Sequence, residues 1–524
     1  MKKFTSSLKL LLISALFVIF SLQATAQPLS PVQIDKLVEK TMAAFNVPGI
    51  AVAIVKDGKV IHSKGYGLRS LNSKDKTDEN TLFAIASNSK AFTSAALGIL
   101  VDEGKLTWNS RVIDFIPEFR LYSPYVTEEF TIKDLLTHRS GLGLGAGDLM
   151  IWPDGSSFTL PEIIHNMRYL KPVSSFRTKY DYDNLLYIVA GEVVSRISGM
   201  TWAEFVQKRI MEPLKMVRSA GSYDNLKDKS NVFDPHIPVE GKLQVVPMTM
   251  NNVANAAGGI YSSVADMSKW AIMQLNRGKY GDSQEKTLLS PAVHQELWTP
   301  QTIIPVRGKT TYKTNFSSYG LGWGLSDVNG YKRVTHTGGL SGVVTQVTLI
   351  PDLNLGIIVF TNQQSGEAFT SITNSILDSY FGITGIDRVA ENLESLHKSQ
   401  DNASKVTEEI WKIVEANRVK GISVADIGMF AGTYRDNWFG DVEISLRDGK
   451  LIFNSKKSPK MAGEMFFYKG STFIVKWFDR SFDADSYANF SFNNQGNVAG
   501  FTMNAISPIT DFSYDFQDLN FLRK

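Results

Sequence analysis

The sequence predicts a large α/β (α+β) domain with an antiparallel sheet flanked by helices, followed by a small all-β barrel domain. Three observations lead to this prediction. Strands joined by tight turns open and close the first part of the chain, helices fill its middle, and a charged connector precedes a run of short strands. The 524 residues, 43% hydrophobic and 20% charged, suffice for two or three domains with a sizeable core.

The first residues have the pattern of a bacterial secretory leader. Three lysines precede an apolar run from Leu10 to Phe20, and Ala24-Thr25-Ala26 gives a small-residue cleavage pattern. The run is shorter than the roughly 20 apolar residues that span a bilayer, which disfavours a membrane anchor. We therefore predict a signal peptide over residues 1–26 and a protein exported to the periplasm or the medium, with no membrane span after cleavage.

Composition disfavours several classes of partner. The leader carries three lysines and no acidic residue, so its removal takes the net charge of +3 to zero and leaves no basic surplus for nucleic acid. The chain has no cysteine, hence no disulfide and no lipid-attachment cysteine. The histidines lack the spacing of metal ligands, and no metal or cofactor is expected.

Periodicity and turn signals predict the elements of the large domain. Helices are expected at residues 30–45, 87–103, 131–136, 185–197, 264–275 and 369–380. Strands are expected at residues 50–55, 59–65, 320–325, 331–336, 343–350 and 356–361. Asp57-Gly58 joins the first two strands, and Ser262 or Ser263 caps the helix that begins at residue 264.

A change of composition near residue 387 divides the chain. Acidic and basic residues then dominate a stretch with helical spacing, which is typical of a solvated linker helix. Short strands separated by Gly and Asn turns follow, as in a small barrel or sandwich. We predict a main domain over residues 27–386, a charged helical linker over 387–424 and a barrel domain over 425–524.

Ser87 and Lys90 are the first candidates for chemistry. A serine hydroxyl needs a nearby base, residues three apart share a helix face, and burial lowers the pKa of a lysine. The spacing alone is weak evidence, and an ordinary helix cap is the alternative. It recurs at Ser6/Lys9, Ser73/Lys76, Ser283/Lys286 and Ser395/Lys398. Only Ser87, however, opens an apolar, small-residue helix after a strand pair.

Two further clusters, Tyr182-Asp183-Asn184 and the segment His336-Thr337-Gly338-Gly339, strengthen the case for Ser87. Together these residues resemble the three-motif signature of penicillin-recognising serine enzymes. The closest match is the class C β-lactamase-related serine hydrolases, and the resemblance covers residues 29–385. Supporting phrases are Leu135–Leu142, Ala257–Ile260 and Gly320–Gly324.

This resemblance implies a β-lactamase/transpeptidase-like fold and an acyl-enzyme mechanism. In it Ser87 attacks a carbonyl carbon, and Lys90 and Tyr182 share the proton transfers, with either able to be the base. Asn184 would hydrogen-bond the lysine or the substrate. The backbone N–H groups of Ser87 and Gly339 would form the oxyanion hole. Thr337 and Gly338 would lie with them at the substrate.

His336 departs from the family pattern, which has lysine there. A histidine is mostly neutral at pH 7 and gives no permanent charge for a substrate carboxylate. We therefore expect a peptide, amide or ester substrate, as for a D-amino-acid peptidase or an esterase. The alternatives are a β-lactamase or D-Ala carboxypeptidase, and a non-catalytic envelope-binding protein of the same fold. As an alternative for His336 itself, it could be a strand-end residue satisfied by hydrogen bonds.

The last hundred residues resemble the small lipocalin-like domain appended to some members of this family. The segments Phe430–Tyr434 and Asp448–Leu451 carry this resemblance. Three roles stay open: shaping substrate access, pairing with another copy of the chain as a homo-oligomer, or stabilising the protein. The glycine-rich stretch Gly141–Gly147 follows a helix-like segment, so we predict a loop near the site and not a nucleotide loop.

Overall fold

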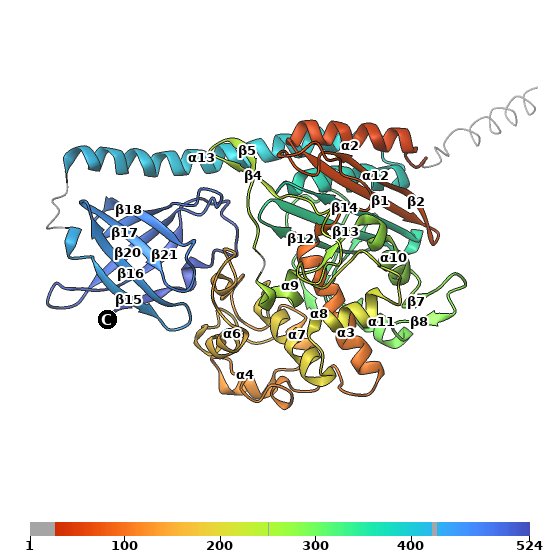
Figure 1. Cartoon of the computed structure of the whole chain (residues 1–524), viewed down its shortest axis with the longest axis horizontal. Helices are drawn as coiled ribbons and strands as arrows, with labels where there is room; N and C mark the ends of the chain where they lie inside the picture. The colour runs from red at the N-terminus through yellow and green to blue at the C-terminus, as the bar shows by residue number, and fades with distance from the viewer. Residues whose placement is uncertain (1–26, 250, 422–426) are drawn as a thin grey trace, which may run out of the picture.

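The computed structural model describes residues 27–249, 251–421 and 427–524, so the predicted signal peptide lies outside the described residues. The chain forms a main body, from α2 (Pro31–Phe45) to α12 (Gly366–Phe381), and a barrel, from β15 (Gly432–Asp436) to β22 (Asn520–Arg523), joined by a long helix (Figure 1). None of the described helices has the length and apolar character needed to cross a membrane.

An eight-stranded sheet forms the centre of the main body, with strand order β2-β1-β14-β13-β12-β11-β10-β9 and antiparallel pairing throughout. This confirms the predicted fold class. The strands are β1 (Gly49–Lys56), β2 (Lys59–Gly67), β9 (Thr302–Ile303), β10 (Ser317–Tyr319), β11 (Gly324–Val328), β12 (Tyr331–Leu340), β13 (Val343–Ile350) and β14 (Leu355–Thr361).

Helices cover both faces of this sheet, which explains why β1 is apolar along its whole length. Ile50, Val52 and Ile54 face α2 and α12 in one apolar cluster. The small residues Ala51 and Ala53 belong to the other cluster, with α3 (Ser89–Asp102) and α10 (Val264–Leu275). Alternation of side chains along a strand therefore builds two cores from one segment.

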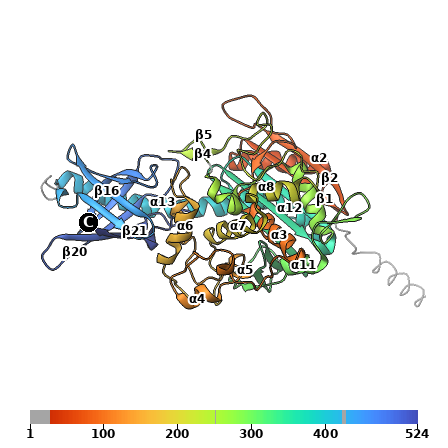
Figure 2. The ribbon, with the colours of Figure 1, turned by 60° about the horizontal axis from the view of Figure 1, so that its bottom comes forward.

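Short helices form the layer below the sheet in Figure 1. They are α4 (Pro124–Glu129), α5 (Ile132–Leu135), α6 (Leu160–Asn166), α7 (Leu185–Ser198), α8 (Trp202–Val206), α9 (Asn255–Gly258) and α11 (Pro291–Leu297). Figure 2 shows α6 on the side of this layer that faces the barrel. There the amide of Asn166 donates a hydrogen bond of 2.8 Å to the backbone oxygen of Trp438.

Two sequence predictions for the sheet were wrong. Residues 320–323 form the turn between β10 and β11 and are not part of a strand. Gly322 has φ +79° there, and a Cβ on it would lie 2.9 Å from the backbone oxygen of Lys90, so this turn requires glycine. The second correction concerns β12, which continues through Gly339 to Leu340 instead of ending at His336. Pairing with β13 extends it.

The barrel is closed by eight antiparallel strands, as the strand and turn pattern predicted. Its strands are β15, β16 (Gly440–Arg447), β17 (Lys450–Ser455), β18 (Ala462–Lys469), β19 (Thr472–Trp477), β20 (Ser486–Phe492), β21 (Val498–Ala505) and β22. Buried aromatic side chains, including Phe453, Phe490 and Phe501, fill the interior. The barrel core is therefore packed by side chains like that of a small barrel.

The helix α13 (Arg388–Lys420) connects the two parts (Figure 1). Its first turn packs against the main body through Val389, and its last turns place Ile410 and Val414 against Ile474 of the barrel. The rest of the helix carries the charged residues that predicted a solvated connector.

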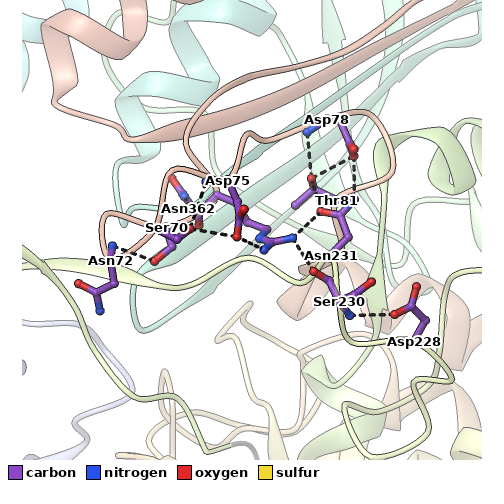
Figure 3. Close-up of polar contacts among 11 residues, drawn as sticks. Ser70, Asn72, Asp75, Asp78, Thr81, Asp228, Ser230, Asn231 and Asn362 are labelled. Carbon is purple, nitrogen blue, oxygen red and sulfur yellow. Dashed lines mark hydrogen bonds and ion pairs between the residues drawn. The ribbon is translucent and has the colours of Figure 1, made fainter.

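The loop between β2 and β3 (Phe83–Ala84) is fixed by side-chain amides (Figure 3). The amide of Asn231 donates to Asp78 and accepts from Thr81, both at 2.9 Å. Asn362 donates to the backbone oxygens of residues 68 and 69 and accepts from the N–H of Gly49 at 2.7 Å. These contacts hold the segment that leads directly to Ser87.

Candidate active site

Ser87 lies in a tight turn, η1 (Ala86–Asn88), immediately before α3. Ala86 has φ +49°, a conformation that non-glycine residues rarely adopt and that costs about 1–2 kcal/mol. The buried side chain of Thr345 on β13 anchors the turn: its hydroxyl donates to the backbone oxygen of Ile85 and accepts from the amide of Asn88, both at 2.8 Å. Surrounding contacts therefore hold Ser87 in a turn whose first residue, Ala86, is strained.

Gly338 on β12 is what allows this turn to approach the sheet. A Cβ on Gly338 would lie 2.3 Å from the backbone oxygen of Ile85 and 2.9 Å from Cβ of Ala86. Gly339 is different, because a Cβ there would meet only Val344, at 3.8 Å. The two glycines of the segment therefore have separate structural requirements.

Lys90, in the first turn of α3, is fully buried below Ser87. Its Nζ lies 3.1 Å from Ser87 Oγ, 2.7 Å from Asn184 Oδ1 and 2.9 Å from the backbone oxygen of Ala257. Burial lowers the pKa of Lys90 to about 7, although the nearby carboxyl groups of Asp148 and Asp183 act in the opposite direction. A large fraction of Lys90 is therefore neutral near physiological pH.

Tyr182 lies beside this lysine, with Lys90 Nζ 4.8 Å from the centre of its ring. Burial raises the pKa of Tyr182 well above its usual range, and the hydroxyl of Ser87 partly offsets that effect. The ring packs on His138 with a centroid distance of 4.2 Å. His138 Nδ1 accepts the N–H of Asp183 at 3.0 Å, so the imidazole is neutral on that nitrogen.

Asn184, the N-cap of α7, connects the lysine to a buried carboxyl group. Its Oδ1 accepts from Lys90, and its Nδ2 donates to Asp148 Oδ2 at 2.7 Å. Asp148 also accepts a hydrogen bond of 3.0 Å from the hydroxyl of Ser513, a residue of the barrel. Burial raises the pKa of Asp148 well above its usual range.

His336 faces the same cavity from β12 but is tied to its neighbours. Its Nε2 lies 2.8 Å from the hydroxyl of Tyr319, and its Nδ1 lies 2.6 Å from the backbone oxygen of Thr337. Burial and the proximity of Lys90 lower the pKa of His336 to about 3. The imidazole is therefore neutral at physiological pH.

A cavity of about 480 Å³ opens over Ser87. Tyr182, Asn184, His336, Thr337 and Gly339 line it, so the structure brings these sequence-predicted residues together, with Lys90 beneath them. The other lining side chains are mainly apolar or aromatic. They include Ile151, Trp152, Tyr180, Ile304, Tyr319, Leu340 and Phe512.

Two carboxyl groups, Asp154 and Asp511, are the charged groups that line the cavity. Asp154 is neutralised by Lys460 of the barrel at 2.7 Å, whereas Asp511 is an exposed residue of the barrel segment. Among the described residues that line the cavity there is no lysine or arginine. Within the described ranges, no cluster of three or more His, Asp and Glu side chains is arranged to hold a metal ion.

Several residues of the site had not been singled out from the sequence. Asp148 directly follows the Gly141–Gly147 stretch, which reaches the site as predicted: the N–H of Gly145 donates to the backbone oxygen of Tyr182 at 2.8 Å. His138 stands inside the phrase Leu135–Leu142, where it could have been found. Ser513 had no local signal, because it comes from the barrel.

Family models agree with this arrangement. The Beta-lactamase model matches residues 34–379, and a model described as a domain of unknown function (DUF3471) matches residues 418–523. The chain is 29% identical over 386 residues to "Unguisins hydrolase ungD'" of Aspergillus campestris, covering 71% of this chain and 69% of that protein. It is 28% identical over 338 residues to "Protein flp" of Staphylococcus aureus, covering 64% and 63%.

Among solved structures, the octameric penicillin-binding protein homologue from Pyrococcus abyssi has a similar fold. The TM-score is 0.60 at 21% identity, and the match covers 94% of this chain and 100% of that one. The likeness extends over both the main body and the barrel and concerns the fold. The family match covers well over half of the chain. The chain therefore belongs to the Beta-lactamase family and is a serine hydrolase of that family.

Proposed function

We propose that this protein is an exported hydrolase that acts through an acyl-enzyme on Ser87, with an ester, amide or peptide as substrate. The observation that carries this proposal is the pairing of Ser87 Oγ with a buried lysine nitrogen 3.1 Å away, at the floor of a cavity. Export rests on the leader pattern of residues 1–26.

In this mechanism neutral Lys90 accepts the proton of the Ser87 hydroxyl as Oγ attacks the substrate carbonyl carbon. Backbone N–H groups of Ser87 and Gly339 stabilise the oxyanion, a contribution of about 3–4 kcal/mol for one such donor. Tyr182 is neutral at physiological pH because its pKa is raised, so it acts as the proton donor. It passes the proton to the leaving group as the bond from that group to the carbonyl carbon breaks.

A water molecule then attacks the acyl carbon. Lys90 first returns the proton that it took from Ser87 to the oxygen of Tyr182, so both groups are neutral again. It then accepts the proton of that water, and the bond between the carbonyl carbon and Ser87 Oγ breaks. Lys90 passes the proton that it took from the water to Oγ, which restores the serine and releases the acid. Lys90 thus accepts the proton of the attacking oxygen in both halves of the reaction.

The cavity favours a substrate without a free carboxylate near the reacting bond. His336 is neutral, with a pKa near 3, and the other lining residues add acidic groups instead of basic ones. A carboxylate at this position would lose hydration without gaining a cation. The mainly apolar walls favour a substrate with an apolar or aromatic acyl or leaving group.

The test is active-site labelling of the full-length protein with a fluorophosphonate probe. Wild type is expected to be labelled and to hydrolyse members of an ester and D-amino-acid amide panel, whereas Ser87→Ala is expected to do neither. Ser283→Ala, which changes the serine of an exposed Ser-x-x-Lys sequence, is the matched control and keeps full labelling. Folded wild type without labelling or turnover would point to a non-catalytic binding protein.

A further inference from the structure

A short segment of the barrel, Asp511–Asp515, reaches into the main body beside the catalytic lysine. The ring of Phe512 meets Tyr182 edge to face at 5.7 Å. Gly145 makes room for this segment, because a Cβ there would lie 2.6 Å from the backbone oxygen of Phe512. Phe512 and Ser513 both line the cavity.

Asp515 fixes the backbone on both sides of Asp148. Its Oδ2 accepts the N–H of Gly147 at 2.6 Å, and its Oδ1 accepts the N–H of Leu149 at 3.0 Å. The Asp515 side chain is fully buried. Two hydrogen bonds to one buried carboxyl group give this backbone a defined position relative to the barrel.

Ser513 then acts on the side chain of Asp148. Its hydroxyl donates to Asp148 Oδ2, the same oxygen that accepts the Nδ2–H of Asn184. An acceptor at that place dictates the orientation of the Asn184 amide: nitrogen toward Asp148 and oxygen toward Lys90. With the opposite orientation the amide would direct an N–H group at the lysine nitrogen.

We propose that the barrel is part of the catalytic machinery: Ser513 and Asp515 are positioning residues that hold Asp148, and through it the amide of Asn184, so that Lys90 is presented to Ser87. This inference rests on the function proposed for Ser87. It gives the barrel a role in the chemistry in addition to shaping access to the cavity. One hydrogen bond joins Ser513 to Asp148, although the two residues are 365 positions apart in the chain.

The charges around Lys90 predict a specific signature for this role. Asp148, Asp183, Tyr182, His138 and His336 face it, from η3 (Asp148–Met150), the loop before α7, the loop after α5 and β12. The hydrogen bond from Ser513 favours the ionised form of Asp148, and a negative Asp148 raises the pKa of Lys90. Without Ser513, the ionised form of Asp148 is less favoured, and the Asn184 oxygen that accepts from Lys90 is less well positioned. Both changes disfavour the protonated lysine, so the pKa of Lys90 falls.

The experiment compares Ser513→Ala with wild type in the full-length protein, by fluorophosphonate labelling rates and by ester hydrolysis across pH. We expect the plateau labelling rate and kcat to fall by about tenfold to 100-fold. KM should stay within a factor of about two for a small ester that does not reach the barrel, and the acid limb of the profile should move to lower pH. Ser513→Thr keeps the hydroxyl and should restore most of the rate.

Ser491→Ala is the matched control, because Ser491 lies exposed on β20, outside the residues that line the cavity. Wild-type kinetics in this variant are expected. A merely structural role for Ser513 would reduce the active fraction and leave the acid limb in place, which would overturn the proposal. So would wild-type rates in Ser513→Ala, or a Thr variant as slow as the Ala variant. Absence of labelling in wild type would instead overturn the proposed function.

Discussion

The side-chain nitrogen of Lys90 lies 3.1 Å from the hydroxyl oxygen of Ser87, and both belong to one turn of chain at the start of α3. Burial has two consequences at once. It fixes this distance, and it lowers the pKa of the lysine from 10.5 to about 7, which favours the neutral amine far more than in water. Burial therefore holds Lys90 beside Ser87 and also makes its amine a usable base.

The first prediction concerns pH. In the proposed mechanism neutral Lys90 is the proton acceptor, so kcat/KM should rise as the pH increases through about 7 and reach a plateau above it. Hydrolysis of a small ester between pH 5 and 9 measures this profile. Lys90→Ala should remove the activity, whereas Lys133→Ala, at a half-buried ion pair with Glu296, should leave the profile unchanged. A wild-type profile that is flat over this range would exclude lysine as the base.

The second prediction concerns Tyr182→Phe, which removes the hydroxyl that we propose donates a proton to the leaving group. The loss should be about 100-fold or more in kcat for an amide and smaller for a p-nitrophenyl ester, whose leaving group needs no proton. Tyr223→Phe is the matched control, since it changes the other Tyr-Asp-Asn triplet, at an exposed tyrosine. Equal losses for amide and ester would contradict the assigned role of Tyr182.

A third prediction exchanges His336 for lysine. The variant gains a cation facing the cavity, so turnover of a reporter cephalosporin, which carries a carboxylate, should rise by about tenfold or more. The melting temperature should fall, because the new ammonium is buried near Lys90. His165→Lys, on the exposed surface of α6, controls for the added charge. No gain in a folded variant would show that His336 does not limit the recognition of carboxylates.

The two glycines of β12 should respond differently to alanine. Gly338→Ala should destabilise the protein by about 1–3 kcal/mol and displace Ser87, because the added methyl group meets the backbone of Ile85. A Cβ on Gly339 would make only an ordinary contact with Val344. The free energy of unfolding of Gly339→Ala should therefore stay within about 0.5 kcal/mol of the wild-type value. Urea denaturation followed by circular dichroism compares them. Equal stability of the two variants would contradict the close approach of β12 to the Ser87 turn.

The last prediction concerns acid stability. The buried carboxylate of Asp134 pairs with Arg139 at 3.0 Å and Arg177 at 2.6 Å. Burial is the largest single effect and would raise its pKa, but the hydrogen bonds from Arg177 and Thr131 and the charge of Arg139 together outweigh it and lower the pKa below the ordinary value of 3.8. Asp134→Asn should therefore destabilise the protein by about 2–3 kcal/mol at pH 7, allowing for the partial exposure of Arg177.

Because a carboxyl group with a lowered pKa stabilises the folded state only while it is ionised, this difference should persist down to about pH 4. It should shrink as the pH falls further, through the pKa of the folded state. Thermal melts of both proteins between pH 3 and 7 measure it. Asp114→Asn, at an exposed ion pair with Arg111, should change stability by less than about 0.5 kcal/mol. A constant gap down to pH 3 would contradict the assignment.

Local patterns in the sequence determined much of this protein. The hairpin of β1 and β2, the strands β13 and β14, the helices α7 and α10 and the alternating strands of the barrel follow from periodicity and turn residues. The proximity of Ser87 and Lys90 follows from their spacing of three residues across the turn η1 and the first turn of α3. Each of these features depends on interactions between residues near each other in the chain.

The tertiary structure decided the rest. Ser513 and Asp148 are 365 residues apart, and neither belongs to a repeating pattern from which their contact could be predicted. Similarly, β12 continues through His336 because β13 supplies its hydrogen-bonding partner, and Gly338 is required because the Ser87 turn approaches it. Local periodicity records which face of an element is buried. It does not record which distant group will meet that face, and the lysine, its amide partner and the barrel serine meet only when the chain has folded.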